Sequence, residues 1–236
     1  MKLDIKIISK YKEGIIAGAP IVVGYVPIAM TFGMLSKAVG ITFLESIMFS
    51  VFVFAGASQF MALNLLVLGV GTWEIILATL LMNSRHLLMS ASLAAKVKGN
   101  IKKGLFFIAF GLTDETFSVA IMKKGNMTTD YLLPLELEAY LGWIGGTLIG
   151  YLVGEILPQL LRNSMGVALY AMFAAILIPE AKKSKKVALL AISAGVLNTL
   201  LNYFKLFSSG WNLIIAIVLI SAAGVYFTRE GVKAYE

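Results

Sequence analysis

Cysteine is absent from the 236-residue sequence, and histidine occurs once, as His86. Without cysteine the chain has no disulfide framework and no thiol for catalysis. One histidine and no cysteine provide too few ligands for a zinc or copper site. The chain also lacks a nucleotide-binding motif. We therefore expect no metal, no other cofactor and no enzymatic activity.

Charged residues are also scarce: they make up 14% of the chain, whereas soluble domains carry about 25%. Hydrophobic residues make up 59%, and the mean hydropathy is +0.87. This chain has too little charge to cover a water-facing surface. We expect an all-α, polytopic integral membrane protein, because backbone groups inside a lipid bilayer must be paired within each segment.

The net charge of +7 accompanies lysines that lie between the apolar segments. Positive charge at such places sets the orientation of a membrane protein and meets anionic lipid. No basic stripe with interleaved aromatic residues is present, which argues against nucleic acid as a partner. We expect the lipid bilayer, not nucleic acid, to be the partner of these positive charges.

Eight apolar segments are candidates for membrane helices, since a span needs about 20 residues. They cover residues 15–35, 43–68, 73–95, 105–122, 133–153, 167–178, 187–204 and 211–227. The connections are short, so we expect one integral membrane domain over residues 1–236 with 6–8 hydrophobic segments. Residues 1–13 are charged, with apolar residues at helical spacing, and predict an amphipathic arm on the membrane surface.

The lysine clusters predict that some segments do not cross the membrane. Clusters at residues 2–12, 96–103 and 182–186 should all be cytoplasmic. Three segments separate successive clusters, and three full crossings would put those clusters on opposite sides. The second segment is the best candidate for a re-entrant hairpin, because the small residues around Gly56 divide it into two short half-helices. The short sixth segment predicts a matching half-span in a repeated architecture.

Three polar clusters interrupt the apolar segments, and they carry the candidate site. A charged side chain such as Arg85 costs about 2.5–3.5 kcal/mol at the centre of a membrane helix. Asp114 and Glu115 lie at a similar depth and are candidate partners for it. His86 has an unperturbed pKa in the physiological range. The candidate residues are Gly56, Ser58 and Gln59 in the first cluster, Asn83, Arg85 and His86 in the second, and Thr113, Asp114 and Glu115 in the third.

Other readings of these residues remain open. The charged pair could only join two helices, and the small residues around Gly56 could only allow close helix packing. Glu136 and Glu138 lie near the end of a segment, where we expect them at the membrane interface. Pro20 and Pro27 each remove a backbone hydrogen bond from the first segment and predict a kink.

The order of these motifs resembles the AzlC family, the larger subunits of branched-chain amino-acid exporters. The resemblance rests on Gly18-Ala19-Pro20, Pro27, Phe32-Gly33, the run from Phe54 to Phe60, Asn83-Ser84-Arg85-His86, Thr113-Asp114-Glu115 and Phe117. It implies export of branched-chain amino acids such as valine, and in some members methionine, across the bacterial inner membrane. It also implies a small AzlD-type membrane subunit of about four spans as a partner. Leu87-Leu88-Met89 departs from the family, in which an aromatic residue is expected soon after the histidine.

The leading hypothesis is a multi-pass secondary exporter of apolar zwitterionic amino acids, driven by the proton gradient. The substrate carboxylate would bind the half-helix end near Ser58 and Gln59, or Arg85. The substrate ammonium would face Asp114 or Glu115, and one of these acids or His86 would carry the proton. The alternatives are a non-catalytic membrane subunit or scaffold, and an intramembrane hydrolase with Ser58 as nucleophile and His86 as base.

Overall fold

A computed structural model describes residues 2–97, 104–123, 127–153, 181–205 and 209–232, together with positions 156, 158, 160, 174, 177, 178 and 207. These residues form helices, and the one extended pairing among them is an isolated bridge between Val97 and Met127. The predicted all-α class is confirmed. The chain divides into two compact units: Met1–Phe60 with Asn83–Ala168, and Met61–Met82 with Leu169–Glu236.

Full-length spans are fewer than the hydropathy pattern predicted. Within the described residues, Ile8–Ala38 of helix α1 (Lys2–Ala38) and helix α10 (Lys185–Tyr203) are long and apolar enough to cross a membrane. Helices α6 (Leu105–Gly111) and α7 (Asp114–Met122) would form a third span, bent by 115°. The predicted presence of at least one broken segment is therefore confirmed.

Three of the predicted segments are each divided into two short helices. Segment 43–68 forms α2 (Phe43–Phe52) and α3 (Gly56–Val67). Segment 73–95 forms α4 (Thr72–Asn83) and α5 (Arg85–Lys96), and segment 105–122 forms α6 and α7. The break in segment 43–68 lies a few residues before the predicted position, because the run from Gly56 to Gln59 forms the first turn of α3.

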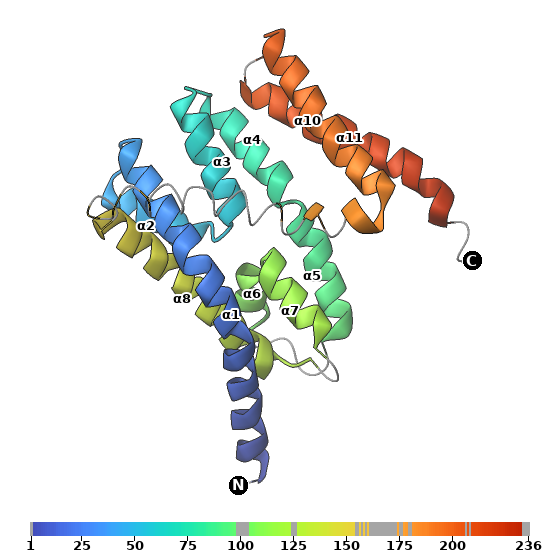
Figure 1. Ribbon diagram of the computed structural model, residues 1–236. Coiled ribbons are helices and arrows are strands. Elements are labelled where there is room, and N and C mark those ends of the chain that lie inside the picture. The colour runs from blue at the N-terminus through green and yellow to red at the C-terminus, as the bar shows by residue number, and fades with distance from the viewer. Residues whose placement is uncertain are drawn as a thin grey trace. The chain divides into compact units, whose positions relative to one another are not determined.

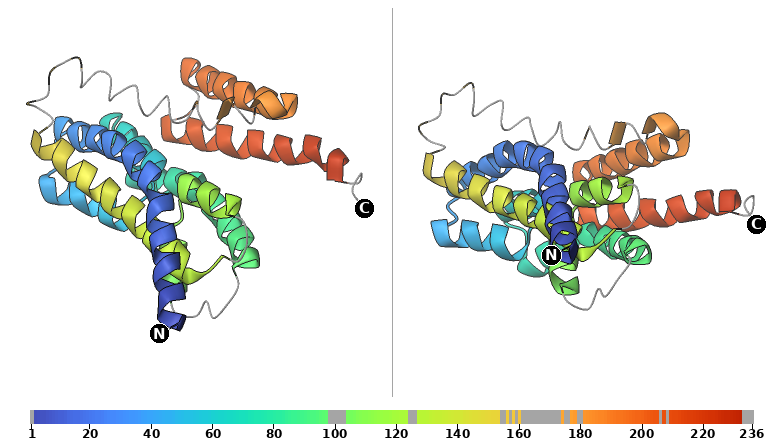
Figure 2. Two further views of the ribbon diagram at one scale, coloured as in Figure 1. Left: turned by 60° about the horizontal axis from the view of Figure 1, so that its bottom comes forward. Right: turned by 90° about the horizontal axis from the view of Figure 1, so that it is seen from below.

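Helix α1 continues through the predicted amphipathic arm without interruption, and both of its prolines lie inside it. Figure 2 shows that α1 bends along its length. Thr31 donates its hydroxyl to the carbonyl of Pro27, four residues earlier. The predicted sixth segment, residues 167–178, and the lysine-rich connection before residue 104 lie almost entirely outside the described residues.

Helices α1 and α8 (Thr129–Val153) form the main packing contact of the first unit, and they lie side by side in Figure 1. The α8 face toward α1 carries glycine at positions 142, 146 and 150, one per turn. A Cβ added at Gly150 would lie 2.0 Å from the backbone oxygen of Met30, and one at Gly146 would lie 2.7 Å from that of Val26. Small residues let membrane helices approach closely where lipid provides no hydrophobic force between them.

The second unit has its own small core. Leu65, Ala78 and Ile214 are buried together, so α11 (Ser209–Val232) packs with the parts of α3 and α4 that belong to this unit. Helices α10 and α11 pack against each other (Figure 1). None of the candidate site residues belongs to this unit.

Candidate functional site

Each of the three polar clusters lies at a break between two helices. Ser58 and Gln59 are in the first turn of α3. The second cluster spans the junction of α4 and α5, and Thr113 is the residue that begins the turn into α7. A broken membrane helix exposes unpaired backbone groups, which neighbouring polar side chains must satisfy. Polar side chains at the breaks can pair the freed backbone groups. Those that are not used in this way could bind a ligand.

The first break, between α2 and α3, is strained and closely packed. Phe54 has φ of +38°, a conformation that costs about 1–3 kcal/mol for a residue other than glycine. A Cβ at Gly56 would lie 2.5 Å from the Trp143 ring, so only glycine lets the indole cover the start of α3. The Ser58 hydroxyl donates to the Ala55 carbonyl at 2.9 Å. The start of α3 is thus packed against protein groups, and carboxylate binding at this half-helix end stays a prediction.

Gln59 is held entirely by protein groups. The Trp143 indole N–H donates to Gln59 Oε1 at 2.9 Å, and Gln59 Nε2 donates to the Ser50 hydroxyl at 3.2 Å. Ser50 is also hydrogen-bonded to Thr147 at 2.7 Å. Ser58 and Gln59 are both 0% exposed. Both side chains hold the break between α2 and α3 in place. An effect of either residue on binding would be indirect, through the groups that it contacts.

The second break carries polar atoms without partners. Asn83 Nδ2 donates to the Ser58 hydroxyl at 3.1 Å, which links the first two clusters. Arg85 Nη2 forms an ion pair with Asp114 Oδ2 at 2.8 Å, which links the second cluster to the third. Asn83 Oδ1 and Arg85 Nε are buried and have no hydrogen-bond partner among the described residues. One acceptor and one donor at this break therefore lack a partner among the described residues.

The third break, between α6 and α7, is anchored to α1 by Tyr25. The Tyr25 hydroxyl donates to Glu115 Oε2 at 2.5 Å and is hydrogen-bonded to Thr113 at 2.6 Å. Thr113 caps α7 reciprocally with Thr116, which fixes the turn. Sequence reasoning missed Tyr25, a single tyrosine within an apolar run. Its ring packs edge-on against Trp143, with ring centroids 5.3 Å apart.

His86 lies in the first turn of α5, half-buried. Among the described residues, no hydrogen bond joins it to Ser58, whose hydroxyl is engaged with Ala55 and Asn83. The nucleophile–base contact that a hydrolase needs is therefore not formed in this arrangement.

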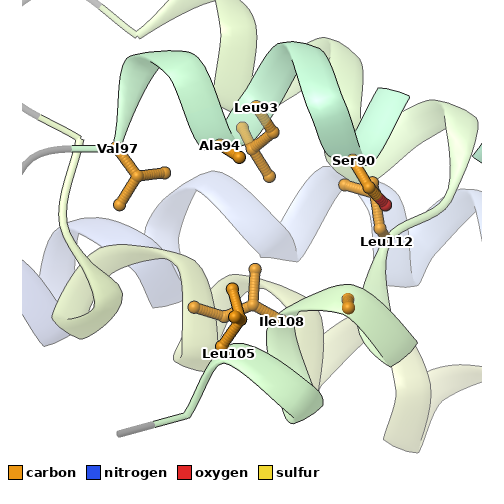
Figure 3. A pocket seen from close by; sticks show the side chains of 8 residues that line it. Ser90, Leu93, Ala94, Val97, Leu105, Ile108 and Leu112 are labelled. Carbon is orange, nitrogen blue, oxygen red and sulfur yellow. The ribbon is translucent and has the colours of Figure 1, made fainter. Parts of the chain in front are cut away.

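An apolar cavity of about 40 Å³ lies between α5 and α6 (Figure 3). Its lining is Ser90, Leu93, Ala94 and Val97 from α5 and its end, and Leu105, Ile108, Ala109 and Leu112 from α6 and its end. Ser90 and Leu112 lie at one end and Val97 at the other. Leu112 directly precedes Thr113, so the chain places this end of the cavity next to the third polar cluster.

Comparisons with known proteins relate the chain to one family. The family model described as AzlC protein matches residues 20–157, a range that contains every candidate site residue. An uncharacterized membrane protein of Archaeoglobus fulgidus is 34% identical over 202 residues, which cover 85% of this chain and 88% of the relative. Inner membrane protein YgaZ of Escherichia coli is 30% identical over 195 residues, covering 79% and 80% of the two chains. Branched-chain amino acid transport protein AzlC of Bacillus subtilis is 28% identical over 170 residues, covering 71% and 66%. No solved structure matches the chain.

Proposed function

The chain belongs to the AzlC family of membrane proteins, and from that premise we propose that it exports branched-chain amino acids across the cell membrane. The name of the Bacillus subtilis relative supports the substrate class, and the name of the Escherichia coli relative supports the inner membrane as location. We further propose that the proton gradient drives export and that a small AzlD-type subunit takes part.

The observation that carries the proposal is a pair of polar atoms at the α4–α5 break that have no partner among the described residues. Arg85 Nε–H can donate to a substrate carboxylate, and Asn83 Oδ1 can accept from a substrate ammonium. Asp114, which pairs with Arg85, and Glu115, which accepts from Tyr25, supply negative charge at the neighbouring α6–α7 break. A free α-amino acid carries these two opposite groups on the same carbon atom, Cα, so a donor and an acceptor that lack partners match its chemistry.

The apolar cavity between α5 and α6 supplies a place for the substrate side chain. Its lining is aliphatic apart from Ser90, and its volume is about 40 Å³. Leucine buries three more carbons than alanine, which at about 0.8 kcal/mol each gives about 2.4 kcal/mol, or a preference of about 60-fold. This arrangement favours aliphatic over small or polar amino acids.

Efflux from loaded membrane vesicles tests the proposal. Arg85→Ala, Asp114→Asn and Glu115→Gln should each lower valine efflux by about tenfold or more at equal protein abundance. Glu13→Gln is the matched control, because it removes a carboxylate that pairs with Lys123 outside the candidate site. Wild-type efflux in all three site variants would refute the assignment of the site.

A non-transporting membrane subunit is the second candidate function. It is favoured by the extent to which Gln59, Ser58 and Asp114 are satisfied by protein partners. The two functions differ in what the purified protein does by itself. Exchange of labelled valine in vesicles that contain only this chain supports transport, and exchange that depends entirely on another subunit supports the second candidate.

A further inference from the structure

Glu136, on helix α8, is a buried acid that the candidate site does not use. It is 3% exposed, and neither carboxylate oxygen has a hydrogen-bond partner among the described residues. The sequence predicted this residue at the membrane interface, but the structure buries it. Acidic side chains are almost never fully buried unless they are paired. An unpartnered glutamate therefore needs a physical reason.

The carboxyl group of Glu136 lies against the end of α6. A Cβ added at Gly111 would lie 2.8 Å from Glu136 Cβ and 2.9 Å from its Oε2. Gly111 is the last residue of α6, and Thr113 begins the turn into α7 that bends the pair by 115°. Glycine at this position is what allows the carboxyl to reach the bend. A change in the angle between α6 and α7 would therefore alter the contact between Glu136 and Gly111.

The same face of α8 also covers the break between α2 and α3. Tyr140 and Trp143 follow Glu136 by four and seven residues, so they share its helix face. The Tyr140 ring packs edge-on against Phe54, with centroids 5.1 Å apart, and Trp143 covers Gly56. One stripe of α8 therefore touches two helix breaks, with the ionisable group at one of them and aromatic rings at the other.

None of the described titratable groups around Glu136 forms a hydrogen bond with its carboxyl. Helices α1, α2, α6 and α7 pack against α8. From residue 8 onward, the titratable residues of these helices are Lys10, Tyr11, Lys12, Glu13, Tyr25 and Lys37 in α1, Glu45 in α2, and Asp114 and Glu115 in α7. Helix α6 has none. Asp114 is paired with Arg85, and Glu115 accepts from Tyr25. On α8 itself, the Tyr140 hydroxyl donates to the carbonyl of Val51.

A carboxylate without a partner is costly in the interior of a membrane protein, by several kcal/mol in apolar surroundings, whereas a neutral carboxylic acid avoids most of that cost. A residue that only filled space between α6 and α8 would not need an ionisable group. Intramembrane acids of this kind commonly form proton pathways.

We propose that Glu136 binds and releases the transported proton, held as a neutral acid against Gly111 when the α6–α7 bend is closed and ionised when opening of the bend admits water. On release the O–H bond of the carboxyl breaks and the proton forms an O–H bond to a water molecule, giving hydronium; on uptake the reverse occurs, with water on the other side of the membrane. This inference rests on the proposed proton-driven transport and deepens it. It assigns coupling to a residue outside the three polar clusters.

Infrared difference spectroscopy of the full-length protein, purified at two pH values, tests the proton site without any substrate. We expect the carbonyl band of a protonated carboxylic acid in the wild type, its loss in Glu136→Gln, and its retention in the control Glu138→Gln, two residues away on the same helix. Gly111→Ala keeps the carboxyl but crowds it, and should shift the pH midpoint of the band. A band that persists unchanged in Glu136→Gln would overturn the proposal.

Transport in membrane vesicles separates this inference from the proposed function. Glu136→Gln should lose gradient-driven leucine movement by about tenfold or more while leucine exchange without a gradient stays within about twofold of the wild type. Undiminished gradient-driven movement overturns the role of Glu136, and so does loss of both activities in a variant that remains folded. Absence of any amino-acid movement by the wild type counts against the proposed function, while the infrared band still decides the proton site.

Discussion

Removal of the Arg85–Asp114 ion pair should separate a structural role of this pair from a functional one. Asp114→Asn leaves the arginine unpaired, and Arg85→Gln leaves the aspartate unpaired. A lone charge at the centre of a membrane helix costs about 2.5–3.5 kcal/mol. The two side chains are 40% and 25% exposed, so protein does not fully enclose them and an unpaired charge can turn toward polar surroundings. We therefore expect each single change to destabilise the protein by about 1–2 kcal/mol, about half of that figure.

The double variant Arg85→Gln/Asp114→Asn carries neither charge, and its stability should return to within about 1 kcal/mol of the wild type. Thermal unfolding in detergent measures this, and a loss of 1–2 kcal/mol should lower Tm by about 2–8 °C for a chain of this length. Valine efflux should nevertheless stay low in the double variant, because the substrate carboxylate loses its cation. Recovery of both stability and efflux would show that the pair only joins α5 to α7, and would refute the site.

Three further changes test separate parts of the structure. Gly150→Ala should destabilise the protein in thermal unfolding, since the added Cβ would lie 2.0 Å from a backbone oxygen of α1. Gly145→Ala on the same helix is the control: its Cβ meets nothing within 4 Å, so this change should be neutral or slightly stabilising. Gln59→Leu should lower the free energy of unfolding by about 1–3 kcal/mol, because it leaves the Trp143 indole N–H buried without its acceptor; an unchanged Tm would contradict that bond. Ala109→Leu should fill the cavity and reduce leucine efflux more than alanine efflux, and an equal reduction of both would count against the cavity as the side-chain site.

The sequence was sufficient to predict the helical membrane class, because that class follows from composition and from the pairing of backbone groups in lipid. It located the α2–α3 break through Gly56 and its small neighbours. It missed the break at Ser84, which has neither glycine nor proline beside it. At the third break, Thr113 and Thr116 have the spacing of a capping box, which is typical of a helix start. The hydropathy pattern alone did not show this start, because the segment is apolar on both sides of it.

Partners in space could not be read from the sequence. Arg85 had two candidate acids one residue apart, and only the turn into α7 decides that Asp114 forms the ion pair while Glu115 receives the Tyr25 hydroxyl. Position along the chain suggested an interfacial Glu136, because that residue lies close to the end of an apolar segment. Its burial depends on Gly111 at the end of another helix, a contact that no local pattern encodes.

The unsatisfied polar atoms at the breaks support a functional reading of the site. Most polar groups here have partners: the Ser58 hydroxyl, the Gln59 amide and the Thr113 hydroxyl all satisfy neighbouring groups. Polar groups kept only for stability should all be paired in this way, since an unpaired buried group costs about 1–3 kcal/mol. Within the part of the chain that the structure describes, Asn83 Oδ1, Arg85 Nε and the Glu136 carboxyl instead remain unpaired, and each lies at or against a helix break. Thr128 Oγ1 and Asn212 Oδ1, which are not candidate site residues, are unpaired as well. A ligand with one anionic and one cationic group, together with a proton, would satisfy the three groups at the breaks.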